Sequence, residues 1–266
     1  MSPPLLLERD GAVATITLNR PDALNTLDFP MIDALIAATT DVAADDKLRV
    51  VVVRANGKHF MAGGDLRTFA NEMGKPGPQR EADFRVLIGR VHAAIENLHR
   101  MPHPVVARVH GAVAGFGMSL MNACDLVVAG DDTYFASAYR NIALTPDGGG
   151  SWTLPRLAGM RRAMEIFLLG ERFDAAQALA YGLVNRVVPV AALDGEVQRV
   201  VQSLVDAPVL AMRNAKRLVR ESLSRSLSAQ LDAEAESFGA CAATPDFVEG
   251  ITAFLEKRPA RFGTSE

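Results

Sequence analysis

One carboxylate in the sequence stands on an unusually bare stretch of chain. Asp147 follows Pro146 and precedes three consecutive glycines in the segment TPDGGGSW at 145–152. Glycines let a ligand approach a neighbouring carboxylate, and apolar neighbours such as Leu144 and Trp152 would raise its pKa toward that of a useful general base. Pro-Asp-Gly is also a common turn tripeptide. The stretch therefore indicates either proton transfer or a purely structural turn.

Two other glycine-rich stretches could supply backbone hydrogen-bond donors. They are HFMAGGDL at 59–66 and HGAVAGFGMSL at 110–120. Glycine allows close approach to the backbone, and the first N–H groups of a helix have no partner within that helix. Two such turns that converge would form an oxyanion hole for a carbonyl oxygen that gains negative charge. Each turn alone also has a structural interpretation, as a helix start capped by Asp65 or as close helix packing at Gly115 and Gly117.

The elements that must position these stretches alternate between strands and helices. Continuous β-branched runs at 48–57, 104–111 and 125–130 are typical of strands buried on both faces of a parallel sheet. Helical segments near 81–100 and 117–123 separate them, as in repeated right-handed βαβ units. The pattern predicts an α/β fold.

The two ends of the chain differ in character. Alternating apolar and polar residues about Asp10-Gly11 predict a β-hairpin, and a helix is expected to follow it. The segment 71–83 is rich in charge, Gly and Pro, and we expect a mobile surface loop beside the site. From about residue 192 helical periodicity dominates, so we expect an α/β core over 1–191 and a helical C-terminal subdomain over 192–266. The segment 71–83 is not expected to link two domains.

Composition argues against several classes of function. A net charge of -3 and a pI near 6.0 provide no field for a polyanion, so no nucleic-acid partner is expected. The basic segment 213–220, with Arg213, Lys216, Arg217 and Arg220, is interpreted as a solvated helix face. Cys124 and Cys241 show neither disulfide nor zinc spacing, and the five histidines show no ligand spacing, so no metal is expected.

No targeting or membrane segment is evident in the sequence. The N-terminal stretch MSPPLLLERDG lacks a basic region and has an apolar run of three leucines. A membrane span needs roughly 20 predominantly apolar residues, and no stretch reaches that length. We therefore expect an unprocessed cytoplasmic protein with no membrane partner.

Taken together, five segments resemble the enoyl-CoA hydratase/isomerase (crotonase) superfamily in order and spacing over essentially the whole chain. The segments are RPDALNTL (20–27), HFMAGGDL (59–66), HGAVAGFGMSLMNACDLVVAG (110–130), TPDGGGSWTLPRLAG (145–159) and ALAYGLVNRVV (178–188). The resemblance implies a repeated ββα superhelix whose C-terminal subdomain mediates trimerisation. It also implies a homotrimer or hexamer, an acyl-CoA thioester substrate with an enolate-like intermediate, and no separate cofactor.

The resemblance assigns roles to individual residues. Gly64 and Phe116 fall where the family places its two oxyanion N–H donors, and a side chain at position 116 does not remove the N–H. Lys257 falls where a neighbouring subunit offers a cation to the CoA phosphates. The other residues expected to contact the substrate or its CoA part are Ala23, Leu24, Ala62, Asp65, Leu66, Gly115, Ser119 and Tyr139.

The reaction depends on which acid or base is present. Hydratases of the family use two glutamates, and those positions are Ser119 and Tyr139 here, so ordinary hydration of an enoyl-CoA is disfavoured. Asp147 falls at the acid position of the isomerase branches, and PDGGGSWTLPRLAG resembles the ring-1,2-epoxyphenylacetyl-CoA isomerases. The resemblance therefore predicts an isomerase of fatty acid metabolism or phenylacetate degradation, with Asp147 as the base.

Three alternatives stay open at this point. A hydratase-like lyase that acts on another acyl-CoA is one of them. A hydrolase similar to 4-chlorobenzoyl-CoA dehalogenase is the second, because GMRRAME at 159–165 resembles that branch, although Tyr139 replaces the tryptophan of that group. A CoA-binding protein without catalysis is the third, since two of the family's three acids are missing.

Overall fold

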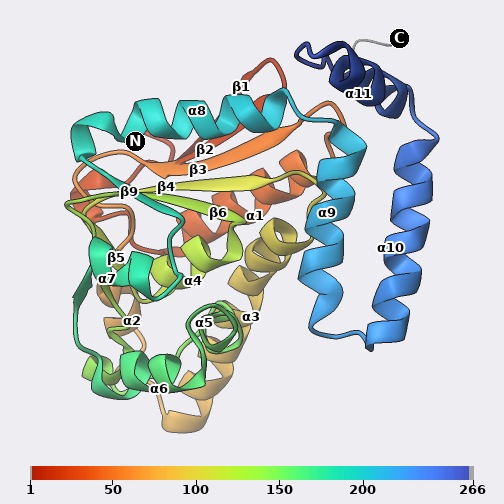
Figure 1. Cartoon of the computed structure of the whole chain (residues 1–266). Coiled ribbons are helices and arrows are strands. Elements are labelled where there is room, and N and C mark those ends of the chain that lie inside the picture. Colours follow the sequence, from red (N-terminus) through yellow and green to blue (C-terminus); the bar gives the residue numbers. More distant parts are fainter. Residues whose placement is uncertain (1, 264–266) are drawn as a thin grey trace.

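The chain begins with the predicted β-hairpin. The computed structural model describes residues 2–263, and Figure 1 shows their arrangement. Strand β1 (Leu5–Asp10) pairs antiparallel with β2 (Val13–Leu18), and Gly11 turns the chain with a φ of 54°. This left-handed conformation suits glycine, which has no Cβ to clash with the backbone. The hairpin forms the edge of the main sheet.

A six-stranded sheet forms the centre of the fold. Its order is β1-β2-β3-β4-β6-β9, and every pair after the first hairpin is parallel. The four further strands are β3 (Val50–Ala55), β4 (Val105–Val109), β6 (Leu126–Gly130) and β9 (Arg186–Val188). The three β-branched runs are therefore strands, as predicted.

Both faces of this sheet are buried, which explains the continuous apolar runs. On β3, Val51 and Val53 point into the larger core cluster, whereas Val50 and Val52 pack in a second cluster with α8 (Leu193–Val205). Successive side chains of a strand alternate between faces, so one valine run supplies both clusters. Helix α8 thus completes the core, although it lies in the segment predicted as the C-terminal subdomain.

A smaller sheet and a group of helices lie beside the central sheet. The small sheet has the order β5-β7-β8, with β5 (Ala112–Ala114), β7 (Tyr134–Ala136) and β8 (Phe173–Asp174). Figure 1 shows α2, α5 and α6 together at one end of the molecule. The helices and short 3-10 turns of this part are η1 (Pro21–Ala23), α1 (Phe29–Ala43), α2 (Leu66–Ala70), α3 (Gly77–Arg100), α4 (Phe116–Ala123), η2 (Tyr139–Ile142), α5 (Gly150–Ala158), α6 (Met160–Leu169), α7 (Ala175–Ala180) and η3 (Val190–Ala192).

The prediction of a mobile loop over 71–83 is wrong for its second half. Helix α3 begins at Gly77, so residues 77–83 form its first turns. Proline is compatible with the first turn of a helix, where a backbone N–H has no intrahelical partner, and Pro78 occupies that place. Arg80 and Glu81, two of the charged residues that suggested a loop, are exposed on these turns.

Three more helices complete the C-terminal part: α9 (Val209–Ser222), α10 (Leu227–Ala242) and α11 (Pro245–Glu256). Figure 1 shows α9 and α10 side by side at the edge of the core, with α11 beyond them. The interpretation of 213–220 as a solvated face is wrong for Lys216, whose side chain is 8% exposed. Lys216 forms an ion pair with Asp125, so α9 directs this charged side chain toward the rest of the fold and away from solvent. Among residues 2–263, no helix is long and apolar enough to cross a membrane.

Candidate functional site

The two glycine-rich turns lie against each other. Met61 N donates to Ala112 O at 3.1 Å, and Ala114 N donates to Met61 O at 2.9 Å. These bonds join the first turn to the small sheet directly before α4. A Cβ added to Gly63 would lie 3.7 Å from Phe116 N, so the backbones approach closely at this point. Turns from two parts of the sequence thus meet, as an oxyanion hole requires.

The backbone N–H groups of Gly64 and Phe116 are free of protein partners. Gly64 lies in a short parallel bridge in which Leu27 N donates to Gly63 O and Asp65 N donates to Leu27 O. Phe116 is the first residue of α4, where the helix provides no acceptor for its N–H. Within residues 2–263 neither N–H donates a hydrogen bond. Both groups are available to a ligand.

Asp147 shares a cavity with these two residues. A small cavity of about 20 Å³ is lined by Gly64, Phe116 and Asp147, together with apolar residues of α1, α2 and α3. The three residues that the resemblance assigned to catalysis therefore lie around one space, although they come from three separate segments of the sequence. That the two N–H groups bind a thioester oxygen stays a prediction.

The glycine after Asp147 allows this packing. Gly148 has a φ of 55°, and a Cβ there would lie 2.8 Å from both the Phe116 ring and Ser119 Cβ. Any side chain would therefore push the 145–150 segment away from α4. The bare stretch has a structural reason in addition to the chemical one, because it lets the backbone beside Asp147 lie directly on the helix that carries Phe116.

Three polar side chains hold the segment around Asp147. Tyr139 Oη donates to Asp147 Oδ1 at 2.7 Å, and Ser119 Oγ donates to Asp147 O at 2.8 Å. Gly148 N donates to Nε2 of His92, a residue of α3, at 3.3 Å. Ser119 and Tyr139 thus contact Asp147 itself. The sequence predicts no role for His92, because no local pattern distinguishes it from His99 on the same helix.

Burial sets the proton affinity of the Asp147 carboxyl. Desolvation raises its pKa above the ordinary value, and the hydrogen bond from Tyr139 and the neighbouring His92 offset only part of this rise. Burial and the nearby carboxylate also raise the pKa of Tyr139, so the phenol keeps its proton and remains a donor. A carboxylate with a raised pKa is a stronger base, as general base catalysis near neutral pH requires.

The expected CoA-contacting residues have different places. Ala62 N donates to Leu24 O at 3.1 Å, so the segments that contain Ala23, Leu24 and Ala62 lie together at the surface beside the first turn. Their contact with CoA stays a prediction. Lys257 directly follows α11, and Figure 1 shows α11 at the opposite end of the molecule from α2 and α5. Within one chain, then, the structure does not bring Lys257 to the site.

Asp65 and Gly115 support the two turns. The Asp65 side chain caps α2 by accepting from Arg67 N at 3.0 Å, and it pairs with Arg20 at 3.2 Å. Burial acts to raise its pKa, but these donors outweigh burial and hold the pKa below the ordinary value. Gly115 starts α4 with a φ of 52°. Both residues position the donor turns, and direct contact with substrate stays a prediction for them.

A large apolar cavity lies next to the small one. Its volume is about 870 Å³, it is open to solvent, and residues of α2 and α3 line it together with Ile142 and Leu144. Phe69 lines both cavities, and His92 lines the larger one, so the two spaces adjoin at the Asp147 segment. Leu66 also lies on its wall. A cavity of this size and apolar lining can hold an acyl group beside the carboxylate.

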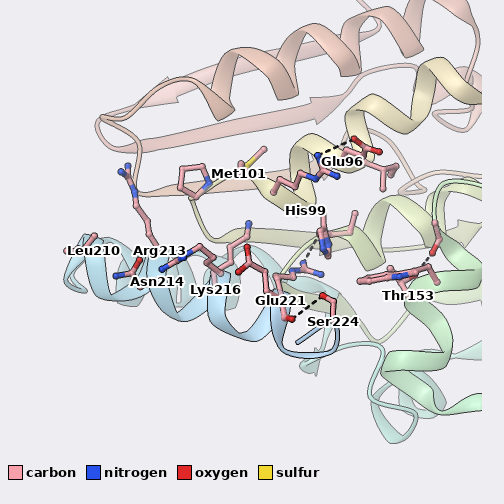
Figure 2. A pocket seen from close by; sticks show the side chains of 18 residues that line it. Glu96, His99, Met101, Thr153, Leu210, Arg213, Asn214, Lys216, Glu221 and Ser224 are labelled. Atoms are coloured by element: carbon pink, nitrogen blue, oxygen red, sulfur yellow. Dashed lines mark hydrogen bonds and ion pairs between the residues drawn. The ribbon is translucent and has the colours of Figure 1, made fainter. Parts of the chain in front are cut away.

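A second large cavity, shown in Figure 2, lies between the core and α9. Its volume is about 940 Å³, and His99 and Thr153 face Lys216 and Glu221 across it. Its basic side chains are engaged: Lys216 pairs with Asp125, and other basic residues bond to backbone or side-chain oxygens. Asp147 does not line this cavity. We therefore assign the site to the space around Asp147.

Comparison with known proteins identifies the family of this chain. A family model described as enoyl-CoA hydratase/isomerase matches residues 8–265. The chain belongs to the enoyl-CoA hydratase/isomerase family. It is a family of the crotonase superfamily, so the resemblance drawn from the five sequence segments is confirmed.

Relatives and solved structures cover almost the whole chain. The chain is 33% identical to a trans-2-decenoyl-[acyl-carrier-protein] isomerase of Streptococcus mutans and 32% identical to the 1,2-epoxyphenylacetyl-CoA isomerase of Escherichia coli; each match covers 97% of both proteins. A crystal structure of an enoyl-CoA hydratase from Mycobacterium smegmatis superposes with a TM-score of 0.91 at 35% identity, over 99% of this chain and 100% of that one. The predicted α/β crotonase fold is therefore confirmed, and this member of the enoyl-CoA hydratase/isomerase family resembles proteins named for both reactions.

Proposed function

We propose that this family member is an acyl-CoA isomerase in which Asp147 moves a proton between two carbons of the bound acyl group. One observation carries the proposal. The only carboxylate expected to act as the base is partly buried and lines a cavity with Gly64 and Phe116. Ser119 and Tyr139, which replace the hydratase glutamates, are both hydrogen-bonded to Asp147. Neither residue offers a second carboxylate to activate water.

The geometry suggests the following sequence of events. The thioester oxygen accepts hydrogen bonds from Gly64 N and Phe116 N. The Asp147 carboxylate takes a proton from an acyl carbon, and the electrons of the C–H bond form an enolate whose charge lies on that oxygen. Each preorganised donor lowers the barrier by roughly 3–4 kcal/mol, by analogy with measured oxyanion holes. Asp147 then returns the proton to a different carbon, so the double bond migrates and the composition of the substrate is unchanged.

A substrate panel tests this proposal. It contains 3-enoyl-, 2-enoyl-, epoxyphenylacetyl- and 4-chlorobenzoyl-CoA, with products identified by mass and ultraviolet spectrum. One enoyl group is also presented on acyl-carrier protein, because a relative bears that name. Isomerisation yields a product of unchanged mass. A product that has gained one water, or one in which hydroxyl replaces chlorine, would refute the isomerase assignment in favour of hydration or dehalogenation.

We also propose that the chain assembles as a homotrimer or hexamer. The C-terminal helices expose large apolar side chains, including Phe238 on α10 and Phe254 on α11, which is 81% exposed. A monomer rarely leaves such residues clustered in water. Analytical ultracentrifugation tests the assembly. A single species of 28.5 kDa would refute it and would also leave Lys257 without a neighbouring site to serve.

A further inference from the structure

Tyr139 occupies a place where the family's hydratases carry a carboxylate, yet its contacts are directed at Asp147. We propose that Tyr139 is a positioning residue: its hydroxyl holds Oδ1 of Asp147 and leaves Oδ2 as the oxygen that exchanges the proton. This inference rests on the proposed isomerase function. It goes further by assigning different tasks to the two carboxylate oxygens.

The hydrogen-bond pattern separates the two oxygens. Oδ1 accepts from Tyr139 Oη at 2.7 Å, a distance typical of a charge-assisted O–H···O bond. Oδ2 accepts no hydrogen bond from another residue within residues 2–263. One bond from a fixed phenol removes most of the rotational freedom of the carboxylate, so the unbonded oxygen has a defined direction.

The backbone that carries Tyr139 is held firmly. Tyr139 begins the 3-10 turn η2, and the residues that flank this turn, Ala138 and Ala143, have φ values of 59° and 56°. Left-handed conformations are costly for residues other than glycine and persist only where the surroundings impose them. Arg140 supplies that restraint, because its Nη1 donates to Leu168 O at 2.7 Å and to Leu169 O at 2.6 Å. The strained turn therefore fixes the direction of the phenol.

Among residues 2–263, the other polar groups around Asp147 do not donate a hydrogen bond to its carboxylate. His92, from α3, accepts from Gly148 N, and Ser119, from α4, binds the Asp147 carbonyl. Asp28, at the start of α1, lines the same cavity but pairs with Arg20 at 3.0 Å. Of these groups, Tyr139 alone donates a hydrogen bond to the carboxylate within residues 2–263. Removing its hydroxyl should therefore act directly on the charged form of Asp147.

The test substitutes Tyr139→Phe, which removes the hydroxyl and keeps the ring. A hydrogen bond to a carboxylate favours its charged form, so its loss raises the pKa of Asp147. The acidic limb of the pH profile of kcat/KM should move up by about one pH unit, which is about a tenfold loss of activity below the limb. The dissociation constant of an inert acyl-CoA should change less than about twofold. Tyr181→Phe is the matched control, since that hydroxyl makes no hydrogen bond within residues 2–263.

A second measurement does not depend on turnover. In protein labelled with carbon-13 at the aspartate carboxyl carbons, the Asp147 signal is the one absent from Asp147→Asn. Its titration midpoint should rise in Tyr139→Phe and stay unchanged in Tyr181→Phe. If the midpoint rises but no panel substrate is turned over, the hydrogen bond from Tyr139 to Asp147 is supported and the isomerase function is refuted. Turnover with an unchanged midpoint and an unchanged acidic limb would overturn the role of Tyr139.

A second variant covers the case in which Tyr139→Phe does not fold. Tyr139→3-fluorotyrosine keeps the hydroxyl and makes it a more acidic, stronger donor. A stronger bond favours the charged carboxylate, so the acidic limb and the titration midpoint should both move down. An unchanged midpoint in this folded variant would overturn the proposal as surely as an unchanged midpoint in Tyr139→Phe.

Discussion

Two partly buried aspartates in this chain, Asp125 and Asp147, have different surroundings. Asp125 receives Lys216 Nζ and Arg220 Nη2, each at 2.7 Å, and also the backbone N–H of Val105 at 2.8 Å. Asp147 receives a phenol and forms no ion pair within residues 2–263. Asp125 therefore has two cationic partners, whereas the side-chain partner of Asp147 is an uncharged phenol.

The difference matches the different tasks that we propose for the two carboxylates. A buried charge that only joins elements needs full compensation, and Asp125 ties α9 to the start of β6 in this way. Burial lowers the pKa of Lys216, and the charge of Asp125 opposes that change. A carboxylate so compensated would be a poor base. Asp147 lacks this compensation, and burial raises its pKa, the direction that makes a carboxylate a stronger base.

The largest expected effect comes from Asp147→Asn, which preserves the shape and the turn but removes the base. Turnover of the best isomerase substrate should fall by about 10²–10⁴-fold, the usual contribution of general acid-base catalysis. The dissociation constant of an inert acyl-CoA should change little, because the backbone donors remain. Steady-state kinetics and calorimetric titration check the two quantities.

Asp10→Asn is a matched control, because Asp10 lies in the exposed hairpin turn far from the site in sequence. Asparagine is also a good turn residue, so both variants should fold. If Asp147→Asn keeps more than about a tenth of wild-type turnover, the deficit is smaller than a general base contributes, and Asp147 is only a turn residue.

Asp125→Ala should have its large effect on stability. It leaves Lys216 and Arg220 partly buried without their counter-ion, and breaking such a pair typically costs about 3–5 kcal/mol. Urea denaturation should show this loss in the free energy of unfolding, while turnover of the folded protein at low temperature stays near the wild-type value. The contrast with Asp147→Asn would separate the two aspartates cleanly.

Asp46→Ala is the control for that measurement. Asp46 is 91% exposed and lies 3.7 Å from Arg213, and an exposed pair contributes at most about 1 kcal/mol. A loss in Asp125→Ala no greater than the loss in Asp46→Ala would show that α9 is held by apolar packing rather than by the buried pairs.

Hydration offers a third way to test the Asp147 site. Because Ser119 and Tyr139 provide no carboxylate, hydration of crotonyl-CoA should be at least about 10²-fold slower than double-bond migration in the best substrate. The double substitution Ser119→Glu with Tyr139→Glu should raise hydration and reduce isomerisation, because it removes both bonds to the Asp147 segment. Fast hydration by the wild-type enzyme would contradict the isomerase assignment with Asp147 as the base.

The smallest effect concerns the pH dependence of stability. The folded-state pKa of Asp147 lies above the ordinary 3.8, so the folded protein holds this proton to higher pH than the unfolded chain does. Wild-type stability should therefore fall, relative to Asp147→Asn, as the pH rises from about 4 through the raised pKa, by about 1.4 kcal/mol for each pH unit that separates the folded and unfolded pKa values. Urea denaturation of both proteins at several pH values measures this difference. If wild-type stability instead rises relative to Asp147→Asn over this range, Asp147 is compensated like Asp125.

The local patterns of the sequence determined much of the fold. Runs of β-branched residues specify strands whatever surrounds them, so β3, β4 and β6 appear where they were expected. The five family segments correctly predicted the crotonase fold. The segments around Gly64, Phe116 and Asp147 also contain the residues that line one cavity. Such signals are short-range, and a single sequence displays them fully.

Contacts between distant segments were decided only by the tertiary structure. Nothing near Lys216 in the sequence shows that its ammonium is buried, because the partner Asp125 lies 91 positions away and the packing of α9 brings them together. His92 and Tyr139 likewise meet the Asp147 segment only because α3 and η2 pack around it. A pKa depends on desolvation and on charges within a few ångströms, and those distances exist only once the chain has folded. The sequence therefore identified Asp147 as a candidate base. Only the fold determined that Asp125 pairs with cations and that burial raises the pKa of Asp147.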